Sequence, residues 1–301
     1  MCVQELVKKF SCISVTDAKS LYGETQDALP LLKINHELFD AVIAIQGAHL
    51  VEFSAKGKDP LLWLSPQAIF KQGKAIRGGI PVCFPWFGDN QLSENTPSHG
   101  FVRNRDWQLA DIDVTAEQVS ITFKFTSNEE TQTLYPYSFE AEYKIQLNHQ
   151  IELALTAINL SDTLMPVSFA LHSYHPVADI ETVYIDGLHY TTYLDNTAQL
   201  AAKIQQGPVH FSGELDRIYL NVAEQQRIQS KTPIVLRSKN CHSAIVWNPG
   251  PEKAAQLIDL GEQNYPSFVC VERGNAFSDS WYLAPKEKRQ AELLIGYADG
   301  I

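Results

Sequence analysis

Residues 139–157 have the sequence FEAEYKIQLNHQIELALTA, in which apolar and polar side chains alternate in two runs. The first run ends at Leu147, and after three polar residues the alternation resumes at Ile151. A period of two is that of β-strands with one buried face and one wetter face. Residues 119–125 alternate in the same way. The middle of the chain therefore predicts consecutive strands joined by turns.

Helical patterns are weak in the rest of the chain. Ser65-Pro66-Gln67 predicts one helical turn to about Gln72, because Ser suits the N-cap and Pro the first helical position. A second short helix is predicted over residues 5–10. No Gly/Ser linker, low-complexity run or internal repeat divides the chain. The sequence therefore predicts an all-β fold, a single large β-sandwich over residues 1–301 with antiparallel sheets packed face to face and few short helices.

Composition limits the classes of partner. The chain has 24 basic and 35 acidic side chains, a formal net charge of −11. This charge repels nucleic acid and anionic membranes, and it repels a phosphorylated metabolite unless a few local arginines attract it. Five cysteines without CxxC spacing indicate free thiols in a reducing compartment. The N-terminus lacks the apolar core of a signal peptide, and no run reaches the roughly 18 apolar residues of a membrane span. We expect a cytoplasmic protein.

The segment 74–88, KAIRGGIPVCFPWFG, is polar and glycine-rich in a way that a core strand does not require. Arg77 precedes two glycines, whose backbone can approach a ligand closely or adopt a positive φ. Trp86 and Phe87 offer flat apolar faces that suit the C–H faces of a sugar ring. A tight turn into a core strand, with Arg77 at the surface, explains the same residues equally well.

Residues 98–104, SHGFVRN, place His99 and Arg103 on either side of a Gly-Phe pair. A planar guanidinium can bind a phosphate or a sugar hydroxyl through two donors. A salt-bridged loop is an equally good interpretation of this segment.

Two strand-like segments later in the chain contain candidate acid–base residues. In residues 169–175, FALHSYH, two histidines suggest a metal site, but His172 and His175 would face opposite sides of a strand and make poor co-ligands. Alternatively, His172 is an ordinary core histidine whose ring nitrogens find hydrogen-bond partners within the protein. In residues 269–275, VCVERGN, Glu272 lies inside an apolar strand, where an unpartnered carboxylate is costly. Glu272 either bridges to a nearby cation or, in a pocket, transfers protons.

Six motifs, taken in order, resemble those of the D-hexose-6-phosphate mutarotases, or glucose-6-phosphate 1-epimerases, within the aldose 1-epimerase group. The resemblance covers about residues 41–294. The motifs are Arg77–Pro81 with Phe84–Gly88, His99–Asn104, Leu171–Tyr174, Asp216–Tyr219, Val246–Pro249 and Val269–Glu272. Each motif alone is weak, but six in this order are specific, and they favour the functional interpretations over the structural ones.

The resemblance implies a twisted antiparallel β-supersandwich with the active site in a cleft across one sheet. It implies no metal and no organic cofactor. Glu272 would be the base on the anomeric hydroxyl, and His172 the acid toward the ring oxygen. Asp216 would orient a sugar hydroxyl, and His99 would assist at the ring. The other expected substrate contacts are Arg77 and Arg103 for the phosphate, Trp86 for the ring, and Ser98.

The expected substrate is thus a hexose 6-phosphate such as glucose 6-phosphate, and we expect a monomer that binds neither nucleic acid nor membrane. Ser98, His175 and Arg273 depart from the family pattern and bear on sugar preference more than on reaction type. If the two motif arginines did not hold the phosphate, Lys74 and Arg273 would be the next candidates.

Three rival functions fit parts of the sequence. A non-catalytic sugar-phosphate-binding protein on the same fold would not need both His172 and Glu272. A glycoside hydrolase or lyase usually needs two carboxylates flanking the bond, and Asp216 is the possible second one. A mutarotase for unphosphorylated sugars would not need the paired arginine motifs.

Overall fold

The computed structural model describes residues 3–90 and 96–300, and these residues form mainly antiparallel sheets. The predicted all-β fold is confirmed, and the helices are short. The α-helices are α1 (Val3–Val7), α2 (Ala18–Tyr22), α3 (Glu129–Leu134) and α4 (Gly250–Ala254). The 3₁₀ helices are η1 (Val102–Asn104), η2 (Ile180–Thr182), η3 (Asn196–Ala198), η4 (Glu262–Ser267) and η5 (Phe277–Asp279). Within the described ranges, no helix has the length and apolar character needed to cross a membrane.

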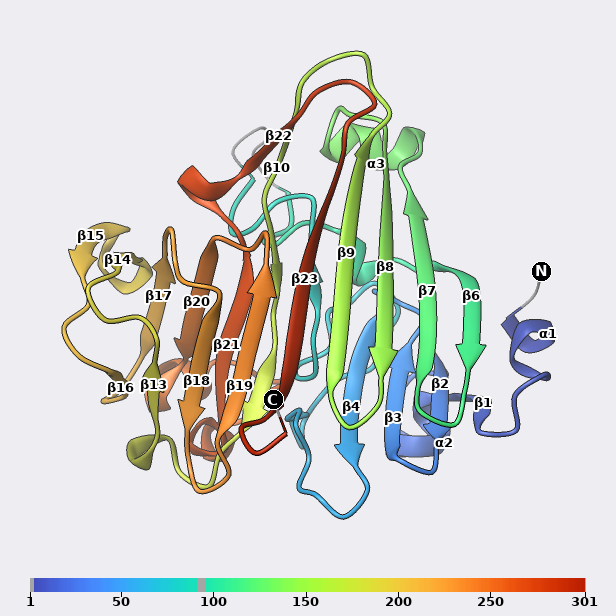
Figure 1. Ribbon diagram of the computed structural model, residues 1–301, viewed down its shortest axis with the longest axis horizontal. Helices are drawn as coiled ribbons and strands as arrows, with labels where there is room; N and C mark the ends of the chain where they lie inside the picture. Colours follow the sequence, from blue (N-terminus) through green and yellow to red (C-terminus); the bar gives the residue numbers. More distant parts are fainter. Residues whose placement is uncertain (1–2, 91–95, 301) are drawn as a thin grey trace.

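The largest sheet has nine strands in the order β16-β13-β18-β19-β23-β9-β8-β7-β6 and runs across the whole molecule (Figure 1). Its strands are β6 (Gln108–Val114), β7 (Val119–Thr126), β8 (Phe139–Leu147), β9 (Ile151–Asn159), β13 (Tyr184–Asp186), β16 (Val209–His210), β18 (Gln225–Gln229), β19 (Ile234–Lys239) and β23 (Lys288–Tyr297). The three strands predicted from alternation are β7, β8 and β9, which pair antiparallel in that order. The alternating residues therefore form the centre of one sheet.

A second layer lies behind the nine-stranded sheet and consists of two sheets (Figure 1). The eight-stranded one contains β5 (Val82–Cys83), β11 (Phe169–Leu171), β12 (Tyr174–Pro176), β14 (Thr192–Asp195), β15 (Ala201–Ile204), β17 (Leu215–Tyr219), β20 (Ser243–Asn248) and β21 (Phe268–Asn275). The four-stranded one contains β1 (Ile13–Asp17), β2 (Pro30–Asn35), β3 (Phe39–Ala44) and β4 (His49–Ala55). A short ribbon pairs β10 (Met165–Val167) with β22 (Trp281–Leu283).

The two layers enclose the main hydrophobic core, and strand β21 shows how the side chains divide. Val269 and Val271 belong to the core between the layers. Cys270 belongs to a different cluster, which contains Trp247 of the neighbouring strand β20. Because successive residues of a strand face opposite sides, Glu272 shares the outer face with Cys270. The outer face of the eight-stranded sheet is therefore the one that can carry a site.

The helix prediction at Ser65 was wrong, because residues 66–67 form only a turn. The Ser65 hydroxyl accepts a hydrogen bond from the Gln67 N–H as a cap would, but its own proton goes to the Asp259 carbonyl. The side chain of Gln26 binds the carbonyl of Ala68 and the N–H of Phe70. These tertiary contacts replace the intrahelical bonds. The N-terminal helix exists as α1, and it ends at Val7 rather than near residue 10.

Candidate active site

Two neighbouring strand segments bring His172 and Glu272 together. Leu171 pairs with Arg273, and Tyr174 pairs with Cys270, so His172 lies beside Glu272 where β11 gives way to β12. The His172 N–H donates to the Pro81 carbonyl at 3.0 Å instead of to β21. The imidazole Nδ1 lies 3.2 Å from Glu272 Oε1. The two side chains are therefore close enough to act as the predicted pair.

Aromatic rings hold the His172 imidazole in place. The Tyr174 ring stacks on it with centroids 4.8 Å apart and planes 4° from parallel. The Trp247 indole meets it edge-on at 6.1 Å, and the His99 ring does so from another direction at 6.1 Å. Packing of this kind fixes the plane of an imidazole without using its nitrogen atoms, which remain available to a ligand.

The pair is nearly dry. Glu272 is 1% exposed and His172 is 8% exposed. Among the described residues, neither His172 Nδ1 nor Glu272 Oε2 has a hydrogen-bond partner. The 3.2 Å contact therefore brings the two groups close without hydrogen-bond geometry. Buried polar atoms without partners are rare in proteins, and each calls for an explanation such as a catalytic role.

Burial favours the uncharged form of both groups. It raises the pKa of Glu272 well above its usual value; the nearby Asp216 adds to this effect and Arg103 opposes it. It lowers the pKa of His172, and His99, Arg103 and Arg77 lower it further. Between the two shifted pKa values the pair therefore holds one titratable proton, and burial favours its residence on Glu272.

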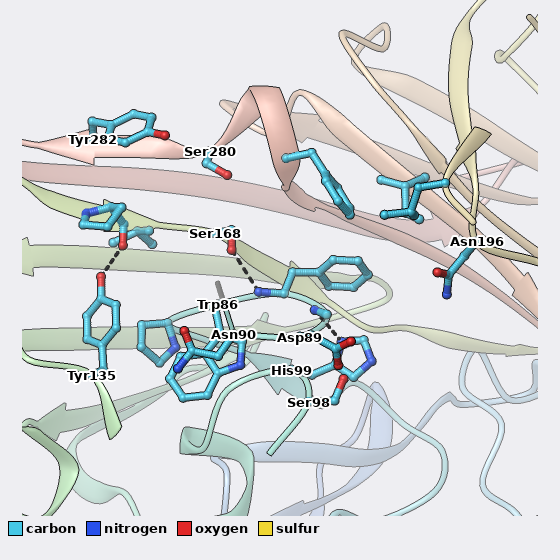
Figure 2. A pocket seen from close by; sticks show the side chains of 18 of the residues that line it. Trp86, Asp89, Asn90, Ser98, His99, Tyr135, Ser168, Asn196, Ser280 and Tyr282 are labelled. Atoms are coloured by element: carbon cyan, nitrogen blue, oxygen red, sulfur yellow. Dashed lines mark hydrogen bonds between the residues drawn. The ribbon is translucent and has the colours of Figure 1, made fainter. Parts of the chain in front are cut away.

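A cleft of about 490 Å³ is lined by His99, whose ring centroid lies 6.1 Å from that of His172, and by Asp216, but by neither His172 nor Glu272. Figure 2 shows Ser98 and His99 on one side of this cleft and Asn196, Ser280 and Tyr282 on the other. Of the eight predicted site residues, the cleft is lined by Trp86, Ser98, His99 and Asp216. Among the described residues that line it, there is no lysine or arginine.

His99 presents a defined tautomer to the cleft. Its backbone has a positive φ of 64°, and its Nδ1 accepts a hydrogen bond from the Gly88 N–H at 3.2 Å. Burial and the charges of Arg103 and Arg77 lower its pKa to about 3. The imidazole is therefore neutral, with its proton on Nε2, and it can donate one hydrogen bond to a ligand.

Asp216 lies on the outer face of β17, opposite Trp247 in the sheet. Burial raises its pKa, although the hydrogen bond from Asn196 works in the opposite direction. The Asn196 amide donates to Oδ2 at 2.7 Å, and both residues line the cleft. No motif marked Asn196, because it comes from η3 and reaches Asp216 only through the fold.

The two predicted phosphate-binding arginines have different surroundings. Arg77 donates from Nε and Nη2 to the Asp259 carboxylate, at 3.3 and 3.2 Å, and from Nη1 to the Tyr174 hydroxyl. Burial disfavours the Arg77 charge, but Tyr174 and Asp259 outweigh burial and raise its pKa. Arg103 donates to the Ser98 carbonyl at 2.9 Å, and no acidic side chain of the described residues forms an ion pair with it. Sequence reasoning missed Asp259, which no motif marks.

The other residues predicted to contact the substrate are less accessible to a ligand than the sequence suggested. Trp86 is 5% exposed, and its indole N–H donates to the Pro97 carbonyl, so it forms mainly the wall of the cleft. The glycine at 79 approaches the backbone of β4 rather than a ligand, because a Cβ there would lie 2.3 Å from the Leu50 carbonyl oxygen. Its φ of 61° is positive, as the sequence suggested.

Arg273, the reserve candidate for the phosphate, faces away from the cleft. It is fully buried and donates to the carbonyls of Ala223 and Cys241 and to the Gln226 side chain. Burial lowers its pKa to about 10. The reserve assignment of Arg273 was therefore wrong, because β21 turns neighbouring residues to opposite faces. Lys74, the other reserve candidate, is exposed and not part of the cleft lining.

His175 does not join His172, in agreement with the predicted strand geometry. It is completely buried, and its Nδ1 lies 3.1 Å from the Leu61 carbonyl oxygen. The residues whose ligand atoms do converge are His172, Cys270 and Glu272, within 4.8 Å of one another. Cys12, Cys83, Cys241 and Cys270 are free thiols, and Cys2 lies outside the described residues.

Comparison with known proteins identifies the family. The family model described as aldose 1-epimerase matches residues 30–296. The chain belongs to the aldose 1-epimerase family. It is therefore an isomerase of the epimerase type.

Individual members of the aldose 1-epimerase family match most of the chain. A protein of Escherichia coli (strain K12) named "Putative glucose-6-phosphate 1-epimerase" is 33% identical over 94% of this chain and 96% of its own length. A protein of Cenchrus ciliaris with the same name is 34% identical over 77% of this chain and 74% of its own. The crystal structure of a Salmonella typhimurium protein, YeaD, described as a "putative mutarotase", has a TM-score of 0.84, with 31% identity over 90% of both chains.

Proposed function

We propose that this aldose 1-epimerase interconverts the α and β anomers of a hexose 6-phosphate such as glucose 6-phosphate. The observation that carries the proposal is the dry contact between His172 Nδ1 and Glu272 Oε1 at 3.2 Å. Mutarotation needs one acid and one base on the two oxygens of a single hemiacetal carbon. A buried imidazole–carboxyl pair that shares one proton supplies both.

The proposed reaction conserves the number of protons on the pair. Transfer of the proton of the pair from Glu272 to His172 gives the reactive form, in which the Glu272 carboxylate takes the proton of the anomeric hydroxyl while the His172 imidazolium donates a proton to the ring oxygen. The C1–O5 bond breaks, C1=O1 forms, and rotation about C1–C2 turns the aldehyde over. Ring closure reverses both transfers on the other face of C1. In this scheme the neutral His99 donates its Nε2 proton to a ring or hydroxyl oxygen, and Asp216 accepts a hydrogen bond from a sugar hydroxyl.

NMR saturation transfer between the two anomeric protons tests this function. We expect faster exchange for glucose 6-phosphate or galactose 6-phosphate than for either free sugar at equal enzyme concentration. Exchange no faster than in buffer, with every sugar, would contradict an anomerase. Equal efficiency for phosphorylated and free sugars would instead indicate an enzyme for unphosphorylated aldoses.

The pH dependence of the exchange follows from the shifted pKa values. Burial lowers the pKa of His172 and raises that of Glu272, so the one-proton form of the pair lies between the two shifted values. We expect kcat/KM, after subtraction of the uncatalysed rate, to be bell-shaped with its plateau between them. It should fall in acid as His172 gains a second proton below its usual 6.5, and in alkali as Glu272 loses its proton above its usual 4.5. A profile that rises with a midpoint at the ordinary Glu value would contradict the burial effect.

Arg103 is the better candidate for the larger share of phosphate binding. The Arg77 charge is already balanced by Asp259, and a phosphate beside that pair would also meet the carboxylate. Arg103 has no acidic partner among the described residues, and its Nε is buried without a hydrogen bond. Its guanidinium binds the carbonyl of Ser98, which lines the cleft. An anion near Ser98 therefore experiences a positive charge that no carboxylate of residues 3–90 and 96–300 pairs with.

Replacing Arg103 by Ala should lower the ratio of kcat/KM for glucose 6-phosphate to that for glucose by about 10- to 100-fold. This is the range of one charge-assisted hydrogen bond of about 1.5–3 kcal/mol. Arg77→Ala should lower the ratio less, because Asp259 already offsets the charge that is removed. Arg103→Lys should restore only part of the loss, since the planar fork is absent. The exposed ion pair of Arg105 with Glu130 provides the control Arg105→Ala, and an unchanged ratio in Arg103→Ala would place the phosphate elsewhere.

A further inference from the structure

We propose that the catalytic pair is also the core of an inhibitory binding site for a thiophilic divalent ion such as Zn²⁺, with Cys270 as the third ligand. The ligand atoms of His172, Cys270 and Glu272 all lie within 4.8 Å of one another, and all three residues are buried. This site goes beyond the proposed isomerase reaction, in which Cys270 has no part.

The geometry of the sheet creates the convergence. Cys270 and Glu272 are two apart on β21, so both side chains point to the outer face. His172 approaches from the adjoining segment, where its neighbour Tyr174 pairs with Cys270. The gap of 3.2 Å between the nitrogen and the nearer carboxylate oxygen matches the ligand spacing of a zinc site. Bonds of about 2.0–2.3 Å in a tetrahedron place neighbouring ligands roughly 3.3–3.7 Å apart, so atoms that lie within 4.8 Å of one another need to close by at most about 1.5 Å.

A second observation points to an external ligand. His172 Nδ1 and Glu272 Oε2 are buried and have no hydrogen-bond partner among the described residues. An imidazole nitrogen, a thiolate and a carboxylate oxygen are the donor types that Zn²⁺ prefers, and three protein ligands leave a fourth position open to water. The surrounding rings of Trp247 and Tyr174 exclude competing solvent.

The charges around the three ligands set the strength of binding. A thiolate and a carboxylate balance the two charges of the ion, and Asp216 adds negative charge nearby. Burial raises the pKa of both Cys270 and Glu272 and so opposes their anionic, metal-binding forms, whereas Arg77 favours the anionic form of Cys270 and Arg103 that of Glu272. Both arginines also repel a cation. We therefore infer a reversible site, occupied when metal is supplied and emptied by a chelator, and not a permanent structural metal.

Occupation of this site blocks the proposed reaction. The metal takes the positions where the shared proton of the pair would reside, so neither His172 nor Glu272 can exchange a proton with the sugar. We expect Zn²⁺ to inhibit anomer exchange and a chelator to restore it. This activity readout rests on the proposed function, so the metal site also needs a measurement that does not.

Cobalt spectroscopy is that measurement. Chelator-treated wild-type protein titrated with Co²⁺ should show a thiolate-to-cobalt charge-transfer band and intense visible bands of a four-coordinate ion, at one equivalent. Cys270→Ser should lose the charge-transfer band. Cys83→Ala is the matched control, because Cys83 is an equally buried free thiol on the same sheet but outside the cluster. It should keep the band.

Inhibition is then compared among the same proteins, each relative to its own metal-free rate. Cys270→Ser should raise the Zn²⁺ concentration for half inhibition by about tenfold or more, since even loss of an outer partner of a metal ligand costs 10- to 100-fold in affinity. Cys83→Ala should match wild type. A wild-type protein without the cobalt charge-transfer band, or with its band lost in Cys83→Ala, would overturn the metal site. A normal band in a protein that exchanges no anomers would overturn the proposed function alone.

Discussion

Replacing Glu272 by Gln should lower the rate of anomer exchange by about 10²-fold or more, the range for removal of a general acid or base. The amide has nearly the same shape as the protonated carboxyl group that burial favours at this position. It cannot, however, accept the anomeric proton. The loss should appear mainly in kcat, measured by saturation transfer at saturating glucose 6-phosphate, because the amide oxygen can still hold a sugar hydroxyl.

The same substitution should leave the protein folded. Glu272 Oε2 is buried without a hydrogen-bond partner among the described residues, so the carboxylate is costly to the folded state. We expect the Tm of Glu272→Gln to equal or exceed that of wild type. Glu292→Gln is a suitable control, because Glu292 is a half-exposed strand residue that pairs with Lys239 at 3.4 Å. Near-normal exchange by folded Glu272→Gln would remove Glu272 from the mechanism.

His172→Ala should lose on the order of 10²-fold or more in exchange for the complementary reason. Without the imidazole, the ring oxygen must leave unprotonated unless water reaches it. The alkaline limb of the pH profile should disappear with the residue, because the acid has no proton left to lose, and the residual rate should rise with pH as Glu272 ionises to its base form. A merely structural role for His172 would lower the rate at all pH values and leave both limbs in place.

A histidine at the surface provides the control for this experiment. His242 is exposed, so His242→Ala should keep both the rate and the pH profile of wild type. Thermal unfolding of His172→Ala should be measured alongside, because the ring that stacks on Tyr174 is lost with the side chain. Exchange within a fewfold of wild type in a folded His172→Ala would rule out His172 as the acid.

Much of the fold followed from local patterns. The alternation over residues 119–157 predicted β7, β8 and β9, because side-chain period is a property of a single strand and needs no knowledge of its partners. The helical turn after Ser65 failed for the opposite reason. Its cap was recognised correctly, but Gln26 and Asp259 compete for the backbone and hydroxyl groups there.

In the site, too, local patterns predicted some features and tertiary contacts decided the others. The sequence by itself determined that a carboxyl group lies within an apolar strand at Glu272 and that neighbours on one strand face opposite sides. It predicted His172 within a strand, whereas the structure places it between β11 and β12. Only the tertiary structure decided which face of β21 borders the cleft, and therefore that Cys270 joins Glu272 while Arg273 is buried behind the sheet. It also decided that Asp259, 182 residues along the chain from Arg77, forms an ion pair with Arg77. Arg103 has no such carboxylate partner among the described residues. Alternation is set by bond geometry within a few residues, whereas charge pairing across a sheet depends on which distant segments the fold places side by side.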